Sequence, residues 1–191
     1  MESFIYVKEN ALTAKDCDGI ISWFEEAKHL HSPGKVGDHR EDHEVKKSTD
    51  ISIDDRMWVE WDDVLSPLLG ALAQGTEEYK KKYTFEGGYG IDFIRDWTIT
   101  QASNVQRYLP GEGFYEWHCE ADGLNIDRVL AWMFYLNTCQ NSGTEFKFQN
   151  MTTQCKQGSL LIWPANWTHF HRGIVSSTET KYIVTGWFNF V

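Results

Sequence analysis

The chain of 191 residues has few cysteines and few basic residues, and each shortage excludes a class of protein. Its 4 cysteines, which form no CxxC pair, fit neither a zinc knuckle nor a dense disulfide framework, so we expect free thiols. The 18 Lys and Arg residues against 28 Asp and Glu residues give a formal charge of −10. Phosphate contacts need clustered cations, and no basic stripe stands out, so nucleic acid is not an expected partner.

Long apolar runs are also missing. No stretch of about 18 or more apolar residues appears, so the sequence predicts no membrane-spanning helix. The first residues, Met1-Glu2-Ser3-Phe4, lack the basic-then-apolar order of a signal peptide. We therefore expect a cytoplasmic protein without a membrane partner.

What the chain does contain is apolar and aromatic surface. Hydrophobic residues make up 41 % of it and aromatic residues 15 %, including 9 Trp, which is enough to build a core. There is no internal repeat and no low-complexity linker, so residues 1–191 are expected to form a single domain. Its helical part should cover about residues 1–97 and its β part about residues 98–191.

The first part reads as helical after a short apolar strand over residues 4–7. Thr13 and Asp16 have the spacing of a capping box, and the apolar positions that follow predict a helix from about 14 to 28. A second helical stripe runs over 58–72, where Pro67 should kink the helix or mark a new start after Ser66. Both helices are expected to pack on a sheet.

The polar segment 29–50 separates these helices and holds His29, His31, His39 and His43. It has glycine and proline breakers and no carboxylate at a fixed place beside the histidines, so we expect a solvated, mobile loop. If it has a function, a lid over a substrate is a better hypothesis than a metal site.

From about residue 97 the pattern becomes that of short strands rich in β-branched and aromatic residues. The predicted strands cover residues 105–109, 129–138, 144–148, 159–163 and 180–190. The fold class expected is α+β, mainly β, with a sandwich or barrel core for which a jelly roll is one solution.

Two of these strands have distinct faces, because side chains alternate along a strand. In residues 129–137, one face carries Leu130, Trp132, Phe134 and Leu136, which should lie under the helices. The other face carries Val129, Ala131, Met133, Tyr135 and Asn137, which should line a cavity. In the last strand, Lys181, Ile183, Thr185 and Trp187 share a face. A lysine in so apolar a strand must reach solvent or find an anion.

The most informative feature is His118-Cys119-Glu120, followed by His171 and then Lys181. In an extended segment, residues i and i+2 point to the same side, so His118 and Glu120 can reach one ion. Two imidazoles and one carboxylate, leaving other coordination positions open, suit a non-heme Fe(II). The cation at Lys181 is then available for an anionic co-substrate.

The distal ligand has two candidates. His169 and His171 have the same parity and can both face inward from an extended segment. The ten-residue step to Lys181 favours His171, and His169 stays as the alternative.

At this point a family resemblance emerges, carried by residues 105–108, 117–120, 135–137, 143–146, 158–164, 171–173 and 181–182. These segments resemble the Fe(II)/2-oxoglutarate dioxygenases, in particular the prolyl-4-hydroxylase-like branch. The resemblance covers roughly residues 103–190. It implies a double-stranded β-helix fold, similar to that of cupins, with the N-terminal helices packed on one sheet.

The resemblance also implies roles for single residues. His118, Glu120 and His171 would hold Fe(II), and Lys181 would pair with the far carboxylate of 2-oxoglutarate. Tyr108 and Tyr135 would contact the co-substrate, and Trp187 would form part of the pocket wall beside it. Arg128 is a weaker candidate for a contact with the substrate.

One departure concerns Glu120, because the family usually has Asp at this position. The added methylene moves the carboxylate by about one C–C bond but keeps its charge and donor type, so we expect metal binding to survive.

The reaction implied is hydroxylation of an unactivated C–H bond, which uses O₂ and 2-oxoglutarate, with ascorbate as a further candidate cofactor, and yields succinate and CO₂. A proline-containing peptide or protein is the first substrate implied, and a free amino acid or another small molecule stays open. Within the dioxygenases, nucleic-acid demethylation is disfavoured by the acidic charge. A different class of function is a non-redox, cupin-like protein that binds a metal or another ligand on the same fold.

Overall fold

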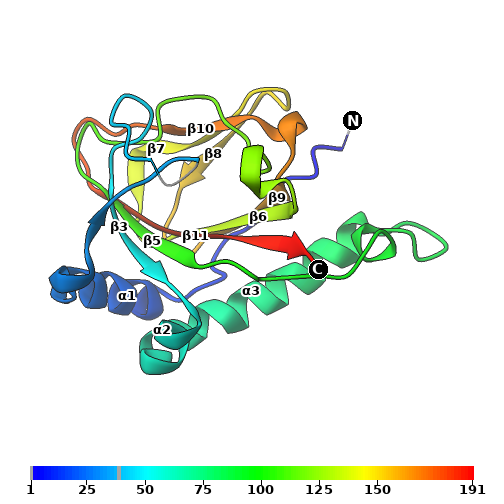
Figure 1. Cartoon of the computed structure of the whole chain (residues 1–191), viewed down its shortest axis with the longest axis horizontal. Coiled ribbons are helices and arrows are strands. Elements are labelled where there is room, and N and C mark those ends of the chain that lie inside the picture. Colours follow the sequence, from blue (N-terminus) through cyan, green and yellow to red (C-terminus); the bar gives the residue numbers. More distant parts are fainter. Residues whose placement is uncertain (1, 38–39) are drawn as a thin grey trace.

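The computed structural model describes residues 2–37 and 40–191, and it consists of two antiparallel β-sheets with helices against the outer face of the larger one (Figure 1). His39 lies outside the described residues. The fold is α+β and mainly β, a jelly roll with N-terminal helices on one sheet, as the sequence predicted.

The larger sheet contains eight strands in the order β1-β9-β6-β11-β5-β3-β2, with β4 paired to β11. These strands are β1 (Tyr6–Lys8), β9 (Leu160–Pro164), β6 (Arg128–Tyr135), β11 (Lys181–Phe190), β5 (Ser103–Tyr108), β3 (Thr49–Ile53), β2 (Ser32–Pro33) and β4 (Trp97–Thr98). The smaller sheet has the order β10-β7-β8, with β10 (His171–Ile174), β7 (Cys139–Phe146) and β8 (Met151–Cys155).

The helices are α1 (Ala14–Glu26), α2 (Asp55–Glu60) and α3 (Asp62–Tyr83), with short 3₁₀ turns at Lys28–Leu30, Ile91–Phe93, Gly123–Asn125 and Trp167–His169. The capping box of α1 is present, because Thr13 and Asp16 each accept a hydrogen bond from the other's backbone N–H. No helix in the described part of the chain is long and apolar enough to cross a membrane.

Of the two expectations for Pro67, a new helix start after Ser66 is wrong, and a kink stays a prediction. The chain breaks instead at Trp61, between α2 and α3, where Asp54 caps the preceding helix by accepting from the backbone N–H of Met57. Pro67 is accommodated inside α3, near its start, where one backbone hydrogen bond is lost without ending the helix.

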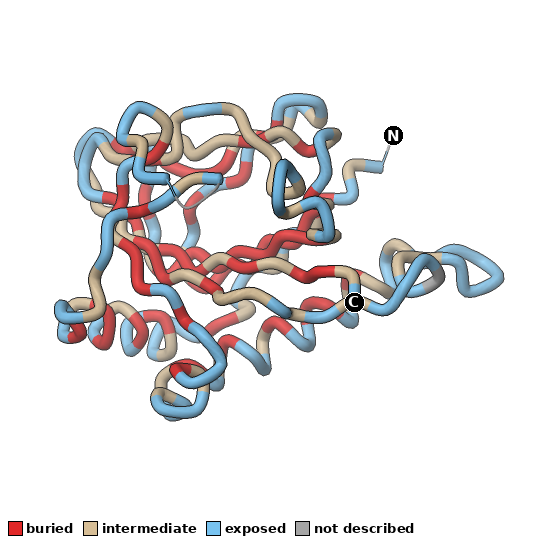
Figure 2. The backbone as a smooth tube through the Cα atoms, viewed as in Figure 1, coloured by how far each residue is buried: buried red, intermediate tan, exposed pale blue. Residues whose placement is uncertain are grey.

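The hydrophobic core has two parts, one on each face of the larger sheet. Leu130, Trp132, Phe134 and Leu136 of the β6 segment are fully buried against α1 and α3, on the face predicted. Figure 2 shows that the central strands of the larger sheet are mostly buried. Val129 packs with them rather than facing the cavity as expected, since the pairing of β6 with β11 shifts register at this end. The second part lies between the two sheets and includes Ala131, Met133 and Tyr135.

Five strands were not predicted, namely the two-residue strands β2 and β4 and the longer strands β3, β8 and β10, and β7 begins earlier than expected. β3 contradicts the helical interpretation of the first part of the chain, because it pairs with β5 and buries Ile51 and Ile53 in the core.

The segment 29–50 is not simply a solvated loop. His31 stacks on Phe24 with ring centroids 4.4 Å apart, and its Nε2 lies 2.8 Å from the carbonyl oxygen of Phe24. Further along, Lys46 and Asp50 are both buried. Residues 35–37 line the central cavity, so the expectation of a lid over a substrate stays a prediction.

Candidate metal centre

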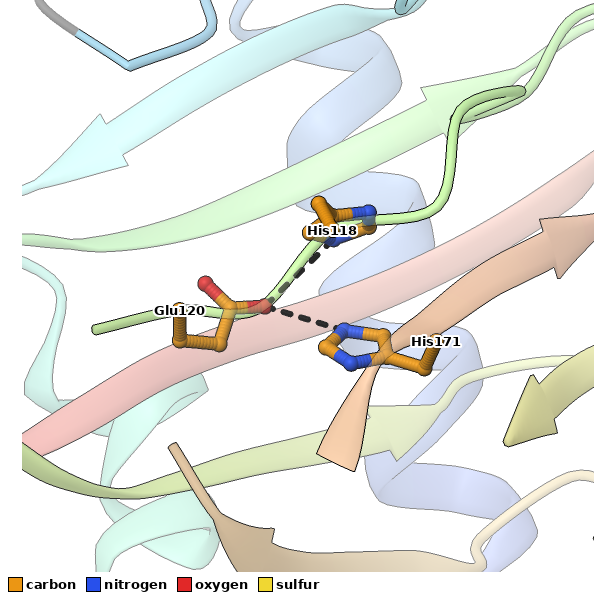
Figure 3. Close-up of side chains that lie close together, drawn as sticks. All are labelled: His118, Glu120 and His171. Atoms are coloured by element: carbon orange, nitrogen blue, oxygen red, sulfur yellow. Dashed lines mark hydrogen bonds and ion pairs between the residues drawn. The ribbon is translucent and has the colours of Figure 1, made fainter. Parts of the chain in front are cut away.

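Three side chains from two distant segments converge at one end of the space between the sheets. The ligand atoms of His118, Glu120 and His171 all lie within 4.8 Å of one another. Oε1 of Glu120 lies 3.1 Å from Nε2 of His171 and 3.6 Å from Nε2 of His118. Figure 3 shows the three side chains pointing toward a common centre.

Both imidazole rings are oriented by backbone carbonyls. Nδ1 of His118 lies 3.0 Å from the carbonyl oxygen of Glu116, and Nδ1 of His171 lies 2.9 Å from that of His169. A ring that donates from Nδ1 presents an unprotonated Nε2, which is the form that binds a metal. The Nε2 atoms of both rings therefore lie beside Oε1 of Glu120, where the three atoms could bind one ion together.

Burial and the charges of neighbouring groups shift the pKa values of Glu120 and His118. Burial alone would raise the pKa of Glu120, but hydrogen bonds from His118 and His171 and their positive charge outweigh it and hold that pKa well below its ordinary value. Burial, together with the charge of His171, lowers the pKa of His118. An ionised carboxylate beside a neutral imidazole is a suitable ligand set for a divalent cation.

Aromatic rings pack around the imidazoles. Phe114 stacks on His118 with ring centroids 3.6 Å apart and planes inclined by 15°. Trp163 and Phe146 lie against His171, with centroid separations of 5.1 and 5.6 Å. These rings restrict the rotamers of both histidines, and Phe114 and Trp163 were given no role in the sequence analysis.

The segment that carries His118 and Glu120 is extended, but it does not form a strand as expected. His118 pairs with His171 in an isolated β-bridge, in which the two residues exchange backbone hydrogen bonds of 3.0 and 2.9 Å. The backbone N–H of Glu120 donates to the carbonyl of Ala165 at 2.9 Å. These bonds fix the loop to β10 and to the end of β9.

His169 is turned away from this cluster. Its Nε2 lies 2.9 Å from the carbonyl oxygen of Ser3, and its Nδ1 lies 2.9 Å from Oγ1 of Thr168. The structure thus brings His171, and not His169, to His118 and Glu120, in keeping with the preferred candidate.

The three side chains line a cavity of about 610 Å³, which also receives Lys181 from β11. Lys181 is 5 % exposed, and its Nζ donates to the carbonyl of Ile174 at 3.4 Å. Within residues 2–37 and 40–191, no carboxylate lies within ion-pair distance of this ammonium. Burial lowers the pKa of Lys181. A buried cation of this kind is a binding group for an anion.

Tyr108 and Tyr135 line the same cavity and are both buried. The hydroxyl of Tyr108 donates to Oε1 of Gln106 at 2.7 Å, whereas that of Tyr135 lies 2.8 Å from Oγ1 of Thr144. Burial, strengthened by the negative charges of Asp50 and Glu120, raises the pKa of Tyr108 well above its ordinary value, so the phenol stays protonated.

Trp187 and Arg128 complete the lining near the cluster, and both contact Glu120. The indole Nε1–H of Trp187 donates to Oε2 of Glu120 at 2.7 Å. Nη1 of Arg128 lies 3.6 Å from the same oxygen. The structure therefore places every predicted site residue on one cavity.

A buried polar network of one residue before β3, one on β3 and one on β5 was not predicted from the sequence. Nζ of Lys46 lies 2.7 Å from Oδ2 of Asp50, which also accepts from Nε2 of Gln106 at 3.1 Å. All three residues line the cavity. The weak signal in the sequence was the i,i+4 spacing of Lys46 and Asp50, which is common among exposed residues and does not by itself indicate burial.

The donor set fits a non-heme iron. Two imidazole nitrogens and one carboxylate oxygen lie close together in the lining of the cavity, so an ion held by them would keep further coordination positions for ligands in the cavity. A structural zinc site is closed by four protein ligands, and the described residues offer three at this place.

Comparison with protein families agrees with this chemistry. Residues 103–189 match the family model of the 2OG-Fe(II) oxygenase superfamily, whose members use Fe(II), 2-oxoglutarate and O₂. A sequence comparison with curated proteins gave no match.

Solved structures with a similar fold include three prolyl hydroxylases. The viral collagen prolyl hydroxylase of Paramecium Bursaria Chlorella virus-1, as its 2OG complex, is 15 % identical, with a TM-score of 0.70 over 98 % of this chain and 97 % of that one. A prolyl-4-hydroxylase of Pseudomonas putida is 16 % identical, with a TM-score of 0.71 over 98 % and 93 %.

The third is the prolyl hydroxylase of Trichoplax adhaerens in complex with a hypoxia inducible factor peptide fragment, 14 % identical with a TM-score of 0.69 over 98 % and 84 % of the two chains. At these identities the likeness concerns the fold. Residues 103–189 are thus similar in sequence to the 2OG-Fe(II) oxygenase superfamily, and the chain shares its fold with prolyl hydroxylases.

Proposed function

We propose that this protein is an Fe(II)- and 2-oxoglutarate-dependent oxygenase that hydroxylates a prolyl residue of a peptide or protein. The observation that carries the proposal is the convergence of His118, Glu120 and His171 on a cavity that also holds the buried cation of Lys181. In this proposal the three converging residues bind Fe(II), and Lys181 binds the far carboxylate of 2-oxoglutarate.

When bound, Fe(II) with 2-oxoglutarate and O₂ supplies the oxidising power for the C–H bond, with succinate and CO₂ as co-products. The residues of this chain bind and orient the reactants. Lys181 provides a fixed positive charge in a buried place, where an ion pair is screened less than at the surface. Ile183 and Met133 line the cavity and exclude water from it.

The tyrosines have supporting roles in the proposal. Tyr108 is the cross-strand partner of Lys181 and lines the cavity beside it, and its protonated phenol is uncharged next to an incoming anion. Tyr135 sits deeper, with its hydroxyl tied to Thr144 and Thr153 of the smaller sheet. We therefore assign Tyr108 to co-substrate contact and Tyr135 to shaping the inner end of the pocket.

The peptide substrate is supported by similarity of fold and by the form of the cavity. Two of the similar structures are named for collagen or contain a hypoxia inducible factor peptide. The cavity of about 610 Å³ is also lined by the neutral polar residues Ser52 and Asn104. Neutral amide and hydroxyl groups of this kind suit the hydrogen-bonding groups of a peptide.

We further propose that the helical part and the β part form one domain. Strands from the first part are integrated in the larger sheet, because β1 pairs with β9 and β3 pairs with β5. Neither part can bury its core without the other.

The test is turnover of 2-oxoglutarate by the purified protein with Fe(II), ascorbate and O₂. We expect succinate to form slowly without a substrate and faster with a proline-containing peptide, whose mass increases by one oxygen. His171→Ala is the matched control, because it removes one ligand and should abolish both products.

Two outcomes would change the proposal. Tight metal binding without succinate release would favour a non-redox binding protein. Succinate release stimulated by a free amino acid, but by no peptide in a library of proline sequences, would retain the oxygenase and remove the peptide substrate.

A further inference from the structure

The two oxygens of the Glu120 carboxylate face different partners. Oε1 faces the imidazoles, at 3.1 Å from Nε2 of His171 and 3.6 Å from Nε2 of His118. Oε2 faces the opposite way and accepts a hydrogen bond of 2.7 Å from Nε1–H of Trp187. One oxygen is thus directed at the proposed metal position, and the other is held by the protein.

Arg128 supports the second oxygen. Its Nη1 lies 3.6 Å from Oε2 of Glu120 and donates to the backbone carbonyl of Glu120 at 3.2 Å. Its guanidinium lies 3.7 Å from the ring centroid of Trp187, which is a cation–π contact. Oε1 of Gln101 accepts from Nε and Nη2 of Arg128 at 3.0 and 2.8 Å, so the guanidinium plane is fixed on both sides.

The contacts of Oε2 restrict the orientation of the Glu120 carboxylate. A glutamate has one more rotatable bond than an aspartate, so its carboxylate has more orientations available, including one with both oxygens turned to the metal. A donor on Oε2 removes that freedom and leaves Oε1 as the oxygen available for coordination. Partners that orient a ligand in this way change metal affinity without touching the metal.

We infer that Trp187 and Arg128 are positioning residues that hold Glu120 as a one-oxygen ligand of the metal. This inference rests on the proposed function, because it assumes that Glu120 binds the metal. It also gives Arg128 a different role from the substrate contact expected from the sequence, since its donors are engaged by Gln101 and Glu120. Trp187 likewise acts through Glu120 rather than on the co-substrate.

The test is a double-mutant cycle read out as the affinity for Mn(II), which stands in for Fe(II) and needs no turnover. In the wild-type background, Trp187→Phe keeps an aromatic ring but removes the donor, and should weaken Mn(II) binding by about 10-fold. In the Glu120→Asp background the carboxylate is withdrawn from the indole by about one C–C bond. Trp187→Phe should then change the affinity less than about 2-fold, so the two effects are not additive.

Trp163→Phe is the matched control. Trp163 also packs beside the cluster, 5.1 Å from the ring of His171, but its Nε1 makes no hydrogen bond in the described structure. The change removes the same indole group without touching the Glu120 carboxylate, so its effect on Mn(II) affinity should be equal in the wild-type and Glu120→Asp backgrounds. Unfolding curves of all variants check that each remains folded.

A second variant tests Arg128 separately. Gln101→Ala keeps Arg128 but frees its guanidinium, and should weaken Mn(II) binding in the wild type more than in the Trp187→Phe variant. Equal losses from Trp187→Phe in both backgrounds, or no loss in either, would overturn the inference. Absence of Mn(II) binding in the wild type would instead contradict the proposed function itself, so the two failures are distinguishable.

Discussion

Lys181 and Tyr108 lie directly opposite each other on β11 and β5, and the ammonium nitrogen of Lys181 is 5.1 Å from the centroid of the phenol ring. The ring offers the cation a partial partner, but it cannot neutralise a full charge. The nearest acceptor is the carbonyl of Ile174, at 3.4 Å. A buried cation with these partners is a candidate binding group for an anion, and two predictions concern it.

Replacing Lys181 with Met should raise the concentration of 2-oxoglutarate needed for half-maximal succinate formation by about 30-fold or more, because an ion pair in a buried site is lost. Lys181→Arg should lose less, since it keeps the charge. Lys156→Met, at an exposed position, is the control and should behave like the wild type. An unchanged requirement in Lys181→Met would remove this residue from the co-substrate site.

The same lysine predicts a pH dependence of co-substrate binding. Because burial lowers its pKa, Lys181 should lose its proton at a pH below that at which an exposed lysine does. Affinity for 2-oxoglutarate then falls as the pH rises through the lowered pKa. The stability cost of burying the ammonium declines between that lowered pKa and the ordinary lysine pKa of the unfolded chain.

The measurement compares wild type and Lys181→Arg with Mn(II) bound, since the guanidinium stays protonated throughout. As the pH rises, the affinity of the wild type for 2-oxoglutarate should fall relative to that of the arginine variant. Taking the ratio of the two affinities cancels effects of pH that both proteins share. A constant ratio up to the pH at which exposed lysines titrate would contradict the prediction.

The two histidines of the distal segment should behave differently. His171→Ala should abolish Mn(II) binding, because a ligand is lost, while His169→Ala should leave it within about 3-fold of the wild type. His169 instead bonds the carbonyl of Ser3, so its loss should appear as a lower free energy of unfolding, by about 1 kcal/mol. Isothermal titration and denaturant unfolding measure the two effects. Retained binding in His171→Ala would reverse the ligand assignment.

Gly186 is a test of packing under the site. It lies opposite Trp132 across β11 and β6, and a Cβ added there would approach Cζ2 of Trp132 to 2.3 Å. Gly186→Ala should lower the free energy of unfolding by about 1–3 kcal/mol, because Trp132 is fully buried and cannot move away. Gly70→Ala, in α3 with nothing within 4 Å, is the control and should raise stability by about 0.5–1 kcal/mol. Equal effects in the two variants would refute the argument.

The buried pair of Lys46 and Asp50 should be sensitive to loss of either member. Asp50→Ala leaves the ammonium of Lys46 buried without a counter-ion and should cost about 3–5 kcal/mol of stability by denaturant unfolding. Lys46→Met combined with Asp50→Ala should cost less than the sum of the single changes. The exposed pair of Arg56 and Glu60 is the comparison, and Arg56→Ala should cost less than about 1 kcal/mol.

Much of the fold could be predicted because alternation along β6 and β11 marked both faces of each strand. The face with Trp132 and Phe134 proved to be the helix side, and the face with Lys181 and Trp187 proved to be the cavity side. These patterns are local, and they are visible in the sequence because side chains alternate between the two faces of each strand.

The parts that were missed depend on long-range contacts. β3 looks like part of a polar loop because Asp50 and Ser52 interrupt its apolar residues, yet these polar groups face a cavity rather than solvent. No local pattern indicates that Gln106 is a partner of Asp50, because the two residues are 56 positions apart in the sequence. The role of Glu120 was found from spacing, but its contact with Trp187, which is 67 positions away, was not.

The isolated β-bridge between His118 and His171 has a consequence for how the centre assembles. Two backbone hydrogen bonds join these residues, so folding itself brings the imidazoles together. Metal binding therefore does not have to offset the entropic cost of ordering the two ligands. A chelator should therefore remove the metal ion without unfolding the protein, and the metal-free protein should bind the ion again when a salt of that metal is added. Such a centre can exchange its occupant in place, unlike a zinc finger, which collapses when its ion is withdrawn.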